Sequence, residues 1–199
     1  MTTRRTARKL ENRGKLLGAA RKVFSDKGYA AATARDIVRE TDLASGTFYN
    51  YFDDKEAAFR AVLEEFTTEA RTIAREQRVK PGVGVEDRLY NAYRAFFELV
   101  VSDPQTFEFL RRNSDVIAYL GAEDMFEDAV RELVEDMREW AAAGEIPQSA
   151  ERWFPYVARS LAGGAFQIGA QMSGATESDV DATARFCARL LLNGLRRLS

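Results

Sequence analysis

Apolar residues recur at helical spacing in almost every segment of this 199-residue chain, and that periodicity limits the fold to packed helices. No segment sustains the alternation of apolar and polar residues that indicates a strand, and only four prolines interrupt the pattern. The Asn193-Gly194 pair is typical of a hairpin, but it lies too close to the C-terminus for a second strand to follow. We therefore predict an all-α protein of about nine helices.

Residues with known capping preferences mark the helix ends in the N-terminal region. A first helix is expected over 10–27, and Gly28 is a fitting stop for it. Thr33 is expected to cap a short second helix, with Asp36 completing a partial capping box. A third short helix over 45–51 follows a tight turn. The N-terminal region is therefore predicted to contain three helices.

A long helix over 54–79 is predicted next, because apolar residues keep to one face and the acidic stretch 53–56 suits a first turn. The sequence Pro81-Gly82-Val83-Gly84 then interrupts the pattern and separates two parts of the molecule. The remaining helices are predicted, in order, near 89–103, 104–112, 115–120, 123–143, 151–172 and 178–197.

Composition excludes most classes of enzyme. The chain has no histidine and a single cysteine, Cys187, which removes His-dependent nucleophilic catalysis, the usual zinc sites and an internal disulfide. The acidic cluster at 123–128 is better explained as a helix start, where carboxylates complement the helix dipole. No apolar run approaches the roughly 20 residues of a membrane helix. We expect no enzyme activity, cofactor, metal or membrane contact, and a cytoplasmic location.

The net charge of −2 is unevenly distributed. Residues 1–56 carry 12 Lys/Arg and 8 Asp/Glu, whereas the remaining 143 residues carry 17 and 23. Within the first 22 residues, Glu11 is the only acid among eight cations. A basic segment of this kind indicates either a surface that meets a polyanion such as nucleic acid, or a solvated tail without a partner.

The most informative stretch runs from Thr33 to Lys55 and reads T-A-R-D-I-V-R-E-T-D-L-A-S-G-T-F-Y-N-Y-F-D-D-K. Two short helices joined by a tight turn predict a helix-turn-helix, whose second helix enters the major groove by its N-terminal end. The small residues 45–47 would let that end approach DNA closely. Phe48 and Phe52 would anchor the same helix to the protein core.

This stretch resembles the DNA-binding domain of the TetR/AcrR family of bacterial transcriptional regulators, whose pattern is close to x-G-x-S-x-G-T-x-Y-x-x-F-x-x-K. The resemblance extends over about residues 10–66. The residues in register are Gly46, Thr47, Tyr49, Phe52 and Lys55, together with Ala19, Ala20, Phe24, Gly28, Tyr29, Thr33 and Ile37 upstream.

Two positions depart from the family pattern. Asp42 stands where the family usually has Gly, and we expect the turn to survive because Asp tolerates the left-handed conformation better than most residues. Ala44 stands where a capping Ser or Thr is common, which would weaken the recognition helix by about 1 kcal/mol. Ser45 is the alternative cap, one residue later.

The resemblance implies a DNA-binding surface with divided roles. Phosphates and sugars would be contacted by Thr33, Thr47, Tyr49, Tyr51 and Lys55, with Lys55 as a point charge. The candidates near base edges are Arg35, Ser45, Gly46 and Asn50, where Asn50 would read adenine and Arg35 guanine. The alternatives are a surface ion pair for Lys55, with Glu56 or Asp53, and packing or solvent for the others. The Arg-rich tail 4–13 either enters a minor groove or adds nonspecific affinity.

The last two predicted helices carry small and leucine-rich faces that suit association, and in the family this pair forms a four-helix bundle between subunits. The alternative is packing within one chain. The expected interface residues are Leu161, Ala165, Ile168, Ala184, Leu191 and Leu195.

The middle of the chain is rich in aromatic residues, which are candidates to line a cavity for a small hydrophobic ligand or else form ordinary core. The expected pocket residues are Phe96, Phe97, Phe107, Arg111, Met125, Phe126, Met137, Trp140 and Phe166. Arg111, with Arg112 and Asn113, would anchor an anionic end. The short segment D-P-x-x-F-x-F-L-R-R also resembles family members that sense fatty acids or acyl thioesters.

The resemblance thus implies a dimeric repressor that binds a palindromic operator and changes its DNA affinity when a small hydrophobic effector binds. Residues 1–56 would form the DNA-binding domain and 57–199 the ligand-binding and dimerisation domain, with the 54–79 helix connecting them. The alternative is a helical protein-interaction adaptor without sequence-specific DNA binding.

Overall fold

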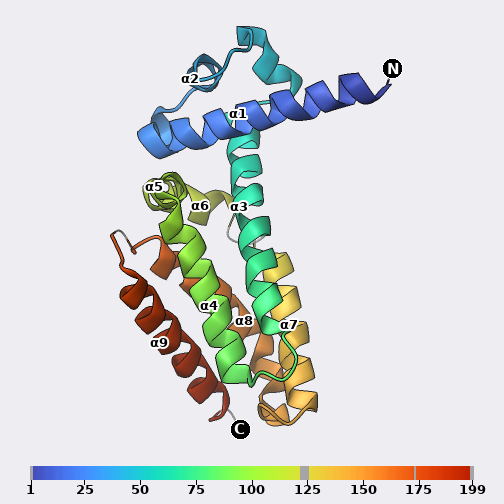
Figure 1. Cartoon of the computed structure of the whole chain (residues 1–199), viewed down its shortest axis with the longest axis vertical. Helices are drawn as coiled ribbons and strands as arrows, with labels where there is room; N and C mark the ends of the chain where they lie inside the picture. Colours follow the sequence, from blue (N-terminus) through green and yellow to red (C-terminus); the bar gives the residue numbers. More distant parts are fainter. Residues whose placement is uncertain (1, 122–125, 173, 198–199) are drawn as a thin grey trace. The chain divides into compact units, whose positions relative to one another are not determined.

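The structure is a computed structural model that describes residues 2–121, 126–172 and 174–197. Within these ranges every regular element is helical, with nine α-helices and two short 3₁₀ helices, so the all-α prediction is confirmed (Figure 1). The chain divides into two compact units. Unit 1 comprises Met1–Phe66 and Gln105–Leu120, and unit 2 comprises Thr67–Pro104 and Gly121–Ser199.

Unit 1 contains the predicted helix-turn-helix and two short helices from later in the chain. Its elements are α1 (Thr2–Ala31), α2 (Ala34–Arg39), the 3₁₀ helix η1 (Ser45–Asn50), the first part of α3 (Lys55–Arg78), α5 (Pro104–Arg112) and α6 (Ser114–Gly121). The first helix begins well before the predicted residue 10. Sequence periodicity missed this extension because residues 4–11 are all exposed and need no apolar face.

Aromatic rings form the centre of unit 1. The Phe59 ring contacts the rings of Phe24 and Phe109, with centroids 5.1 and 5.2 Å apart. Phe48 is fully buried and Phe52 is 5% exposed, so both anchor the η1 region to the core as predicted. Burying a ring of this size stabilises the fold by roughly 1.5–3 kcal/mol.

The C-terminal end of α1 is held by two distant side chains. Gly28 has a positive φ of 76° and ends the regular helix, as predicted. The freed N–H of Tyr29 donates to Asn113 Oδ1 at 2.6 Å, and Lys55 Nζ donates to the Tyr29 carbonyl at 2.7 Å. Asn113 Nδ2 donates in turn to the Phe24 carbonyl at 3.1 Å. The backbone N–H and the carbonyl of Tyr29 therefore both have hydrogen-bond partners within unit 1.

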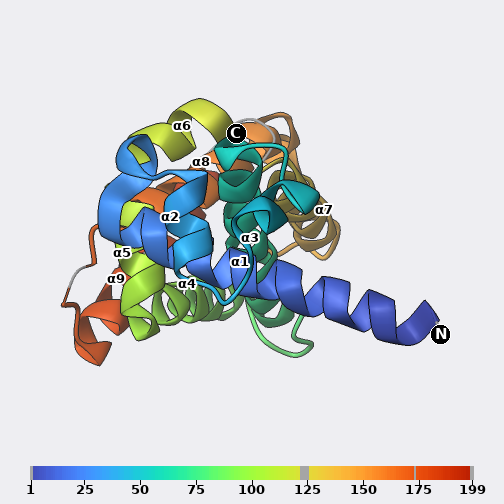
Figure 2. The ribbon, with the colours of Figure 1, turned by 90° about the horizontal axis from the view of Figure 1, so that it is seen from above.

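Unit 2 is a helical bundle built on a long apolar core. Its elements are the second part of α3, α4 (Val85–Ser102), α7 (Glu127–Ala142), the 3₁₀ helix η2 (Gln148–Trp153), α8 (Phe154–Gly169) and α9 (Glu177–Leu195). α4 packs along α9, and α7 packs along α8 (Figures 1 and 2). Phe97, Met137 and Phe154 are fully buried at the centre.

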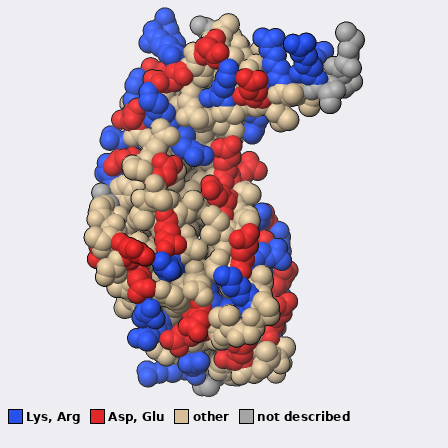
Figure 3. Space-filling view, in the orientation of Figure 1, with Lys and Arg blue, Asp and Glu red and all other residues tan. Residues whose placement is uncertain are grey.

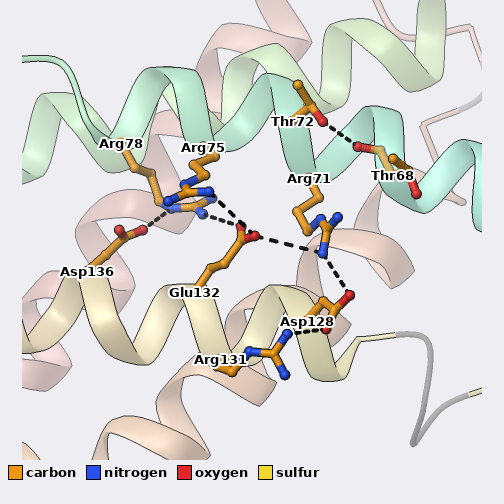
Figure 4. Close-up of polar contacts among 9 residues, drawn as sticks. All are labelled: Thr68, Arg71, Thr72, Arg75, Arg78, Asp128, Arg131, Glu132 and Asp136. Atoms are coloured by element: carbon orange, nitrogen blue, oxygen red, sulfur yellow. Dashed lines mark hydrogen bonds and ion pairs between the residues drawn. The ribbon is translucent and has the colours of Figure 1, made fainter.

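A row of charges joins the second part of α3 to α7 (Figure 4). We call it the arginine–carboxylate ladder, and its members are Arg71, Arg75 and Arg78 on α3 and Asp128, Glu132 and Asp136 on α7. Arg78 Nε donates to Asp136 Oδ2 at 2.6 Å, and both residues are buried. Arg71 reaches the exposed Asp128 at 2.8 Å. The ladder thus has a buried end and an exposed end.

None of the helices in the described part of the chain is both long enough and apolar enough to cross a bilayer.

Candidate nucleic-acid interface

The N-terminus of α2 is closed by a complete capping box. Asp36 N–H donates to Thr33 Oγ1 at 3.1 Å, while the Thr33 N–H and hydroxyl donate to Asp36 Oδ2 at 3.1 and 2.6 Å. The prediction for this cap is confirmed. Because the Thr33 hydroxyl proton is committed to Asp36, its oxygen meets a phosphate only if that bond rearranges.

Lys27 adds a third partner to the same carboxylate, with its Nζ 2.8 Å from Asp36 Oδ1. The hydrogen bond from Lys27 and those from Thr33 together lower the pKa of Asp36 from 3.8 to about 2. The cap is therefore fully charged at neutral pH.

We expect unit 1 to lose stability as the pH falls from about 4 to about 2. The pKa of Asp36 is lower in the folded state, so its contribution is complete above the unfolded pKa of 3.8 and disappears as the pH passes through about 2. Circular dichroism melts of the wild type and Asp36→Asn would show a difference in midpoint above pH 4 that closes near pH 2. Asp115→Asn, at an exposed acid of α6, is the control and should follow the wild type. A difference that persists unchanged at low pH would contradict the assignment.

The turn between α2 and η1 does not use a left-handed residue. No non-glycine residue in the described ranges has a positive φ, so the turn forms as expected but without the left-handed conformation expected of Asp42. The Asp42 carboxylate instead accepts from Lys15 Nζ of α1 at 3.1 and 3.2 Å. Thr41 supports the turn, because its Oγ1 donates to the Val38 carbonyl and accepts from Leu43 N–H.

The η1 helix begins without a side-chain cap. Ala44 occupies the N-cap position and makes no capping hydrogen bond. The alternative cap, the Ser45 side chain, lies outside the described residues. The helix adopts 3₁₀ geometry, in which residues three apart in sequence lie above one another.

This three-residue repeat sorts the predicted DNA-contacting side chains onto two edges. Thr47 and Asn50 share one edge, and Gly46 and Tyr49 share the other. Tyr49 is 64% exposed, Asn50 and Gly46 are also exposed, and Thr47 is half-buried. Their burial is limited because Phe48, between the two edges, takes the inward position. The structure thus brings four of the predicted residues to one exposed element.

The remaining candidates lie around this element. Arg35 on α2 and Thr33 at its cap are exposed, and Tyr51 is half-buried directly after η1. Lys55, at the start of α3, lies 4.2 Å from the centre of the Tyr29 ring and pairs with neither Asp53 nor Glu56. An ammonium has three donors, and one of these is used by the Tyr29 carbonyl. Its phosphate contact stays a prediction.

Residues 16–62 match the family model described as bacterial regulatory proteins, tetR family. They run from the buried part of α1, through α2 and η1, into the first turns of α3. The chain belongs to the TetR family of helix-turn-helix transcriptional regulators. This is a family of regulators and not of enzymes.

Three relatives illustrate the similarity of this TetR-family chain. It is 30% identical over 97 residues to the uncharacterised regulator YdgC of Bacillus subtilis, covering 47% of this chain and 50% of YdgC. The fatty acid degradation regulator FadR of Bacillus halodurans superposes with a TM-score of 0.77 at 21% identity, covering 92% of this chain and 96% of FadR. The FadR of Bacillus subtilis, solved with stearoyl-CoA, gives a TM-score of 0.71 at 17% identity, covering 90% and 97%. The chain spans about half or less of the length of the curated relatives it matches first.

Burial separates the predicted dimer residues of this TetR-family chain into two groups. Leu161, Ala184 and Leu195 are at most 5% exposed and pack in the core of unit 2, so these three offer almost no surface to a partner. We therefore withdraw these three residues from the predicted interface. Their apolar face packs against other helices of the same chain. Ala165, Ile168 and Leu191 are half-buried at the edge of the same core.

Sequence reasoning missed the apolar residues that α8 and α9 do expose. Phe186 and Leu190, four residues apart on α9, are 62% and 63% exposed, and Tyr156 on α8 is 67% exposed. Phe186 and Leu190 were overlooked because they lie off the helix face of small residues and other leucines from which the interface was predicted. The four-residue spacing of Phe186 and Leu190 would have revealed them, because it places two large apolar side chains on one face of a helix.

The predicted pocket residues are divided between the units. Phe97, Met137, Trp140 and Phe166 are buried in unit 2, and Phe96 and Phe126 are half-buried there. Phe107 and Arg111 belong to unit 1. The Arg111 guanidinium is exposed and pairs with Glu108 at 2.7 Å, while Asn113 is fully committed to hydrogen bonds within unit 1 and is therefore not an anchor for a ligand. Met125 lies outside the described residues.

Proposed function

We propose that this chain is a homodimeric, cytoplasmic regulator that binds a palindromic operator and acts as a repressor whose DNA affinity is altered by a small hydrophobic effector. The observation that carries the proposal is η1, which exposes hydroxyl, amide and phenol groups on two edges while Phe48 anchors it from behind. An exposed tyrosine beside an exposed asparagine, on an element anchored by a buried Phe48, suits recognition of a nucleic acid.

In this proposal residues 1–56 form the DNA-binding domain. Asn50 and Arg35 read bases, Ser45 and Gly46 allow close approach, and Thr47, Tyr49 and Tyr51 contact the backbone. Lys55 and Thr33 add phosphate contacts beside them. Residues 57–199 form the effector-binding and dimerisation domain, joined to the first by the long α3 helix.

Dimerisation is supported by the exposed apolar residues of α8 and α9. A TetR-type recognition element binds one half-site, and a two-fold dimer presents two of them about 34–36 Å apart. Phe186, Leu190 and Tyr156 would be buried against a second copy, as large exposed apolar groups generally mark an interface.

A fatty acyl thioester is the effector that we favour. The support is the cluster of aromatic residues in unit 2, where the Phe126 and Phe166 rings pack at 5.7 Å and Phe96 lies against Gly169. The similarity of fold to the FadR solved with stearoyl-CoA is consistent with this choice. Apolar surroundings with few polar groups suit a long alkyl chain.

The proposal is tested by binding to a palindromic DNA fragment from beside the chain's own gene, at low salt, with and without stearoyl-CoA. We expect tight binding without effector and a shift in affinity when stearoyl-CoA is added, with a coupling of about 1–3 kcal/mol. Absence of binding under both conditions would reject the regulator and leave the protein-interaction adaptor as the explanation. A DNA affinity that does not change when stearoyl-CoA is added would reject stearoyl-CoA as the effector.

Asn50→Ala is expected to relax the preference at one base position of the operator by about 1–3 kcal/mol, because a side-chain amide pairs with adenine through two hydrogen bonds. Binding measured against a set of single-base operator variants would show this as a flattened profile at one position in each half-site. Thr47→Ser, on the same edge of η1, is the control and should keep the profile. An unchanged profile for Asn50→Ala would remove Asn50 from the base-reading residues.

A further inference from the structure

The cations of α1 fall into two groups that the sequence alone does not separate. In the middle of the helix, carboxylates of unit 1 neutralise three of them: Lys15 pairs with Asp42 at 3.1 Å, Arg21 with Glu65 at 3.1 Å and Lys22 with Glu40 at 2.5 Å. Farther along, Lys27 pairs with Asp36. Much of the positive charge counted in the first part of the chain is therefore cancelled by the fold.

The cations of the first turns have no such partners. No carboxylate in the described residues lies within 4.0 Å of the basic side chains of residues 4–13, which we call the basic arm: Arg4, Arg5, Arg8, Lys9 and Arg13. Within the described residues, the Arg13 guanidinium lies over the Phe52 ring, 5.7 Å from its centroid. Figure 3 shows these side chains gathered at one end of α1, and Figures 1 and 2 show this end clear of the other elements of unit 1.

Folding does not explain this concentration of charge. Every residue from 4 to 11 is exposed, so the part of the arm before Arg13 gains little packing energy. Cations in the first turns of a helix oppose its dipole, and no acid in the first turn of α1 offsets them. Like charges at neighbouring turns also repel one another. A polyanion outside the protein would offset both electrostatic costs.

We propose that the basic arm lies along the phosphate backbone of DNA beside the site contacted by η1 and adds affinity without reading sequence. This inference rests on the proposed function. Its five cations are spread over about 14 Å of helix, a length over which a duplex presents a charge every 1.7 Å or so. An α-helix about 10–12 Å across does not enter a minor groove about 6 Å wide, so we assign the helical arm to the phosphate backbone rather than to the minor groove.

The test compares two variants that remove the same charge from the same helix. The arm variant carries Arg4→Gln, Arg5→Gln and Arg8→Gln, and the control carries Lys15→Gln, Arg21→Gln and Lys22→Gln. Fluorescence anisotropy with a short random-sequence duplex, over a range of KCl concentrations, gives the slope of log K against log salt. We expect the slope of the arm variant to shrink by about 2.7 per bound subunit, whereas the control keeps close to the wild-type slope. Thermal melts should show the arm variant folding as the wild type does, because its substituted residues are exposed.

Four outcomes would overturn the inference while leaving the regulator intact. The first is a wild-type slope in the arm variant, and the second is an equal loss in the control variant. The third is a changed ratio of operator to random-sequence affinity in the arm variant, since phosphate contacts carry no sequence information. Stronger arm-dependent binding to phosphatidylserine vesicles than to the duplex would likewise reassign the arm to a lipid surface. Failure of the wild-type protein to bind any duplex would instead reject the proposed function itself.

Discussion

Replacing Asp136 by Ala is expected to lower the free energy of unfolding of unit 2 by about 3–5 kcal/mol. The change leaves the Arg78 guanidinium buried, at 6% exposure, without its 2.6 Å partner. Glu132 does not replace that partner, because its Oε2 lies 3.9 Å from Arg78 Nη2 and neither atom makes a hydrogen bond. An uncompensated buried charge is among the most destabilising single changes a core undergoes.

Tryptophan fluorescence during urea unfolding is a suitable measurement, since Trp140 and Trp153 both lie in unit 2. Asp128→Ala is the matched control, because it breaks the exposed end of the same ladder, and we expect it to cost less than about 1 kcal/mol. The double change Arg78→Met with Asp136→Leu removes both charges and should recover most of the loss. If Asp136→Ala and Asp128→Ala lowered the free energy of unfolding equally, burial would not determine how much each ion pair of the ladder stabilises unit 2.

Replacing Phe186 and Leu190 together by Glu is expected to convert the proposed dimer into a monomer and to weaken operator binding by about 10²–10⁴-fold. Both side chains are more than 60% exposed on α9, so the substitutions leave the core of unit 2 intact. In the proposed two-fold interface each new carboxylate would be buried against apolar surface of the second copy, which is costly. The loss of affinity follows because two half-sites are no longer bound by one linked molecule.

Sedimentation velocity gives the oligomeric state, and a binding titration on the same operator fragment gives the affinity. Val79→Glu is the control, since Val79 is another exposed apolar residue of unit 2, at 53% exposure, outside α8 and α9. It should leave both measurements unchanged. If the double variant remained dimeric, the interface would not lie on this face of α9.

Local features of unit 1 could be predicted from the sequence because the groups involved are close together in the chain. The Thr33–Asp36 cap needs only one turn of helix, and Gly28 ends α1 because its positive φ suits a residue without a side chain. The anchoring role of Phe48 followed from its position between polar neighbours. These predictions required no knowledge of what packs against the segment.

Assignments that depend on partners distant in the chain could not be made in this way. Asn113 was considered as a ligand anchor, yet the Tyr29 N–H, 84 residues away in sequence, occupies its side chain. Asp42 was expected to adapt the backbone, whereas it pairs with Lys15 across 27 residues. Leu161 and Leu195 were assigned to an interface because periodicity identifies an apolar face without naming its neighbour.

The amino-acid sequence by itself determined that this chain is helical, where most of its helices begin and end, and that a helix-turn-helix lies between residues 33 and 55. Tertiary structure alone decided which charges remain free on α1, which Arg and Asp are buried between α3 and α7, and which apolar residues of α9 stay exposed. The physical reason is range: capping and periodicity act within a few residues. Burial and ion pairing depend on segments that meet only when the chain has folded.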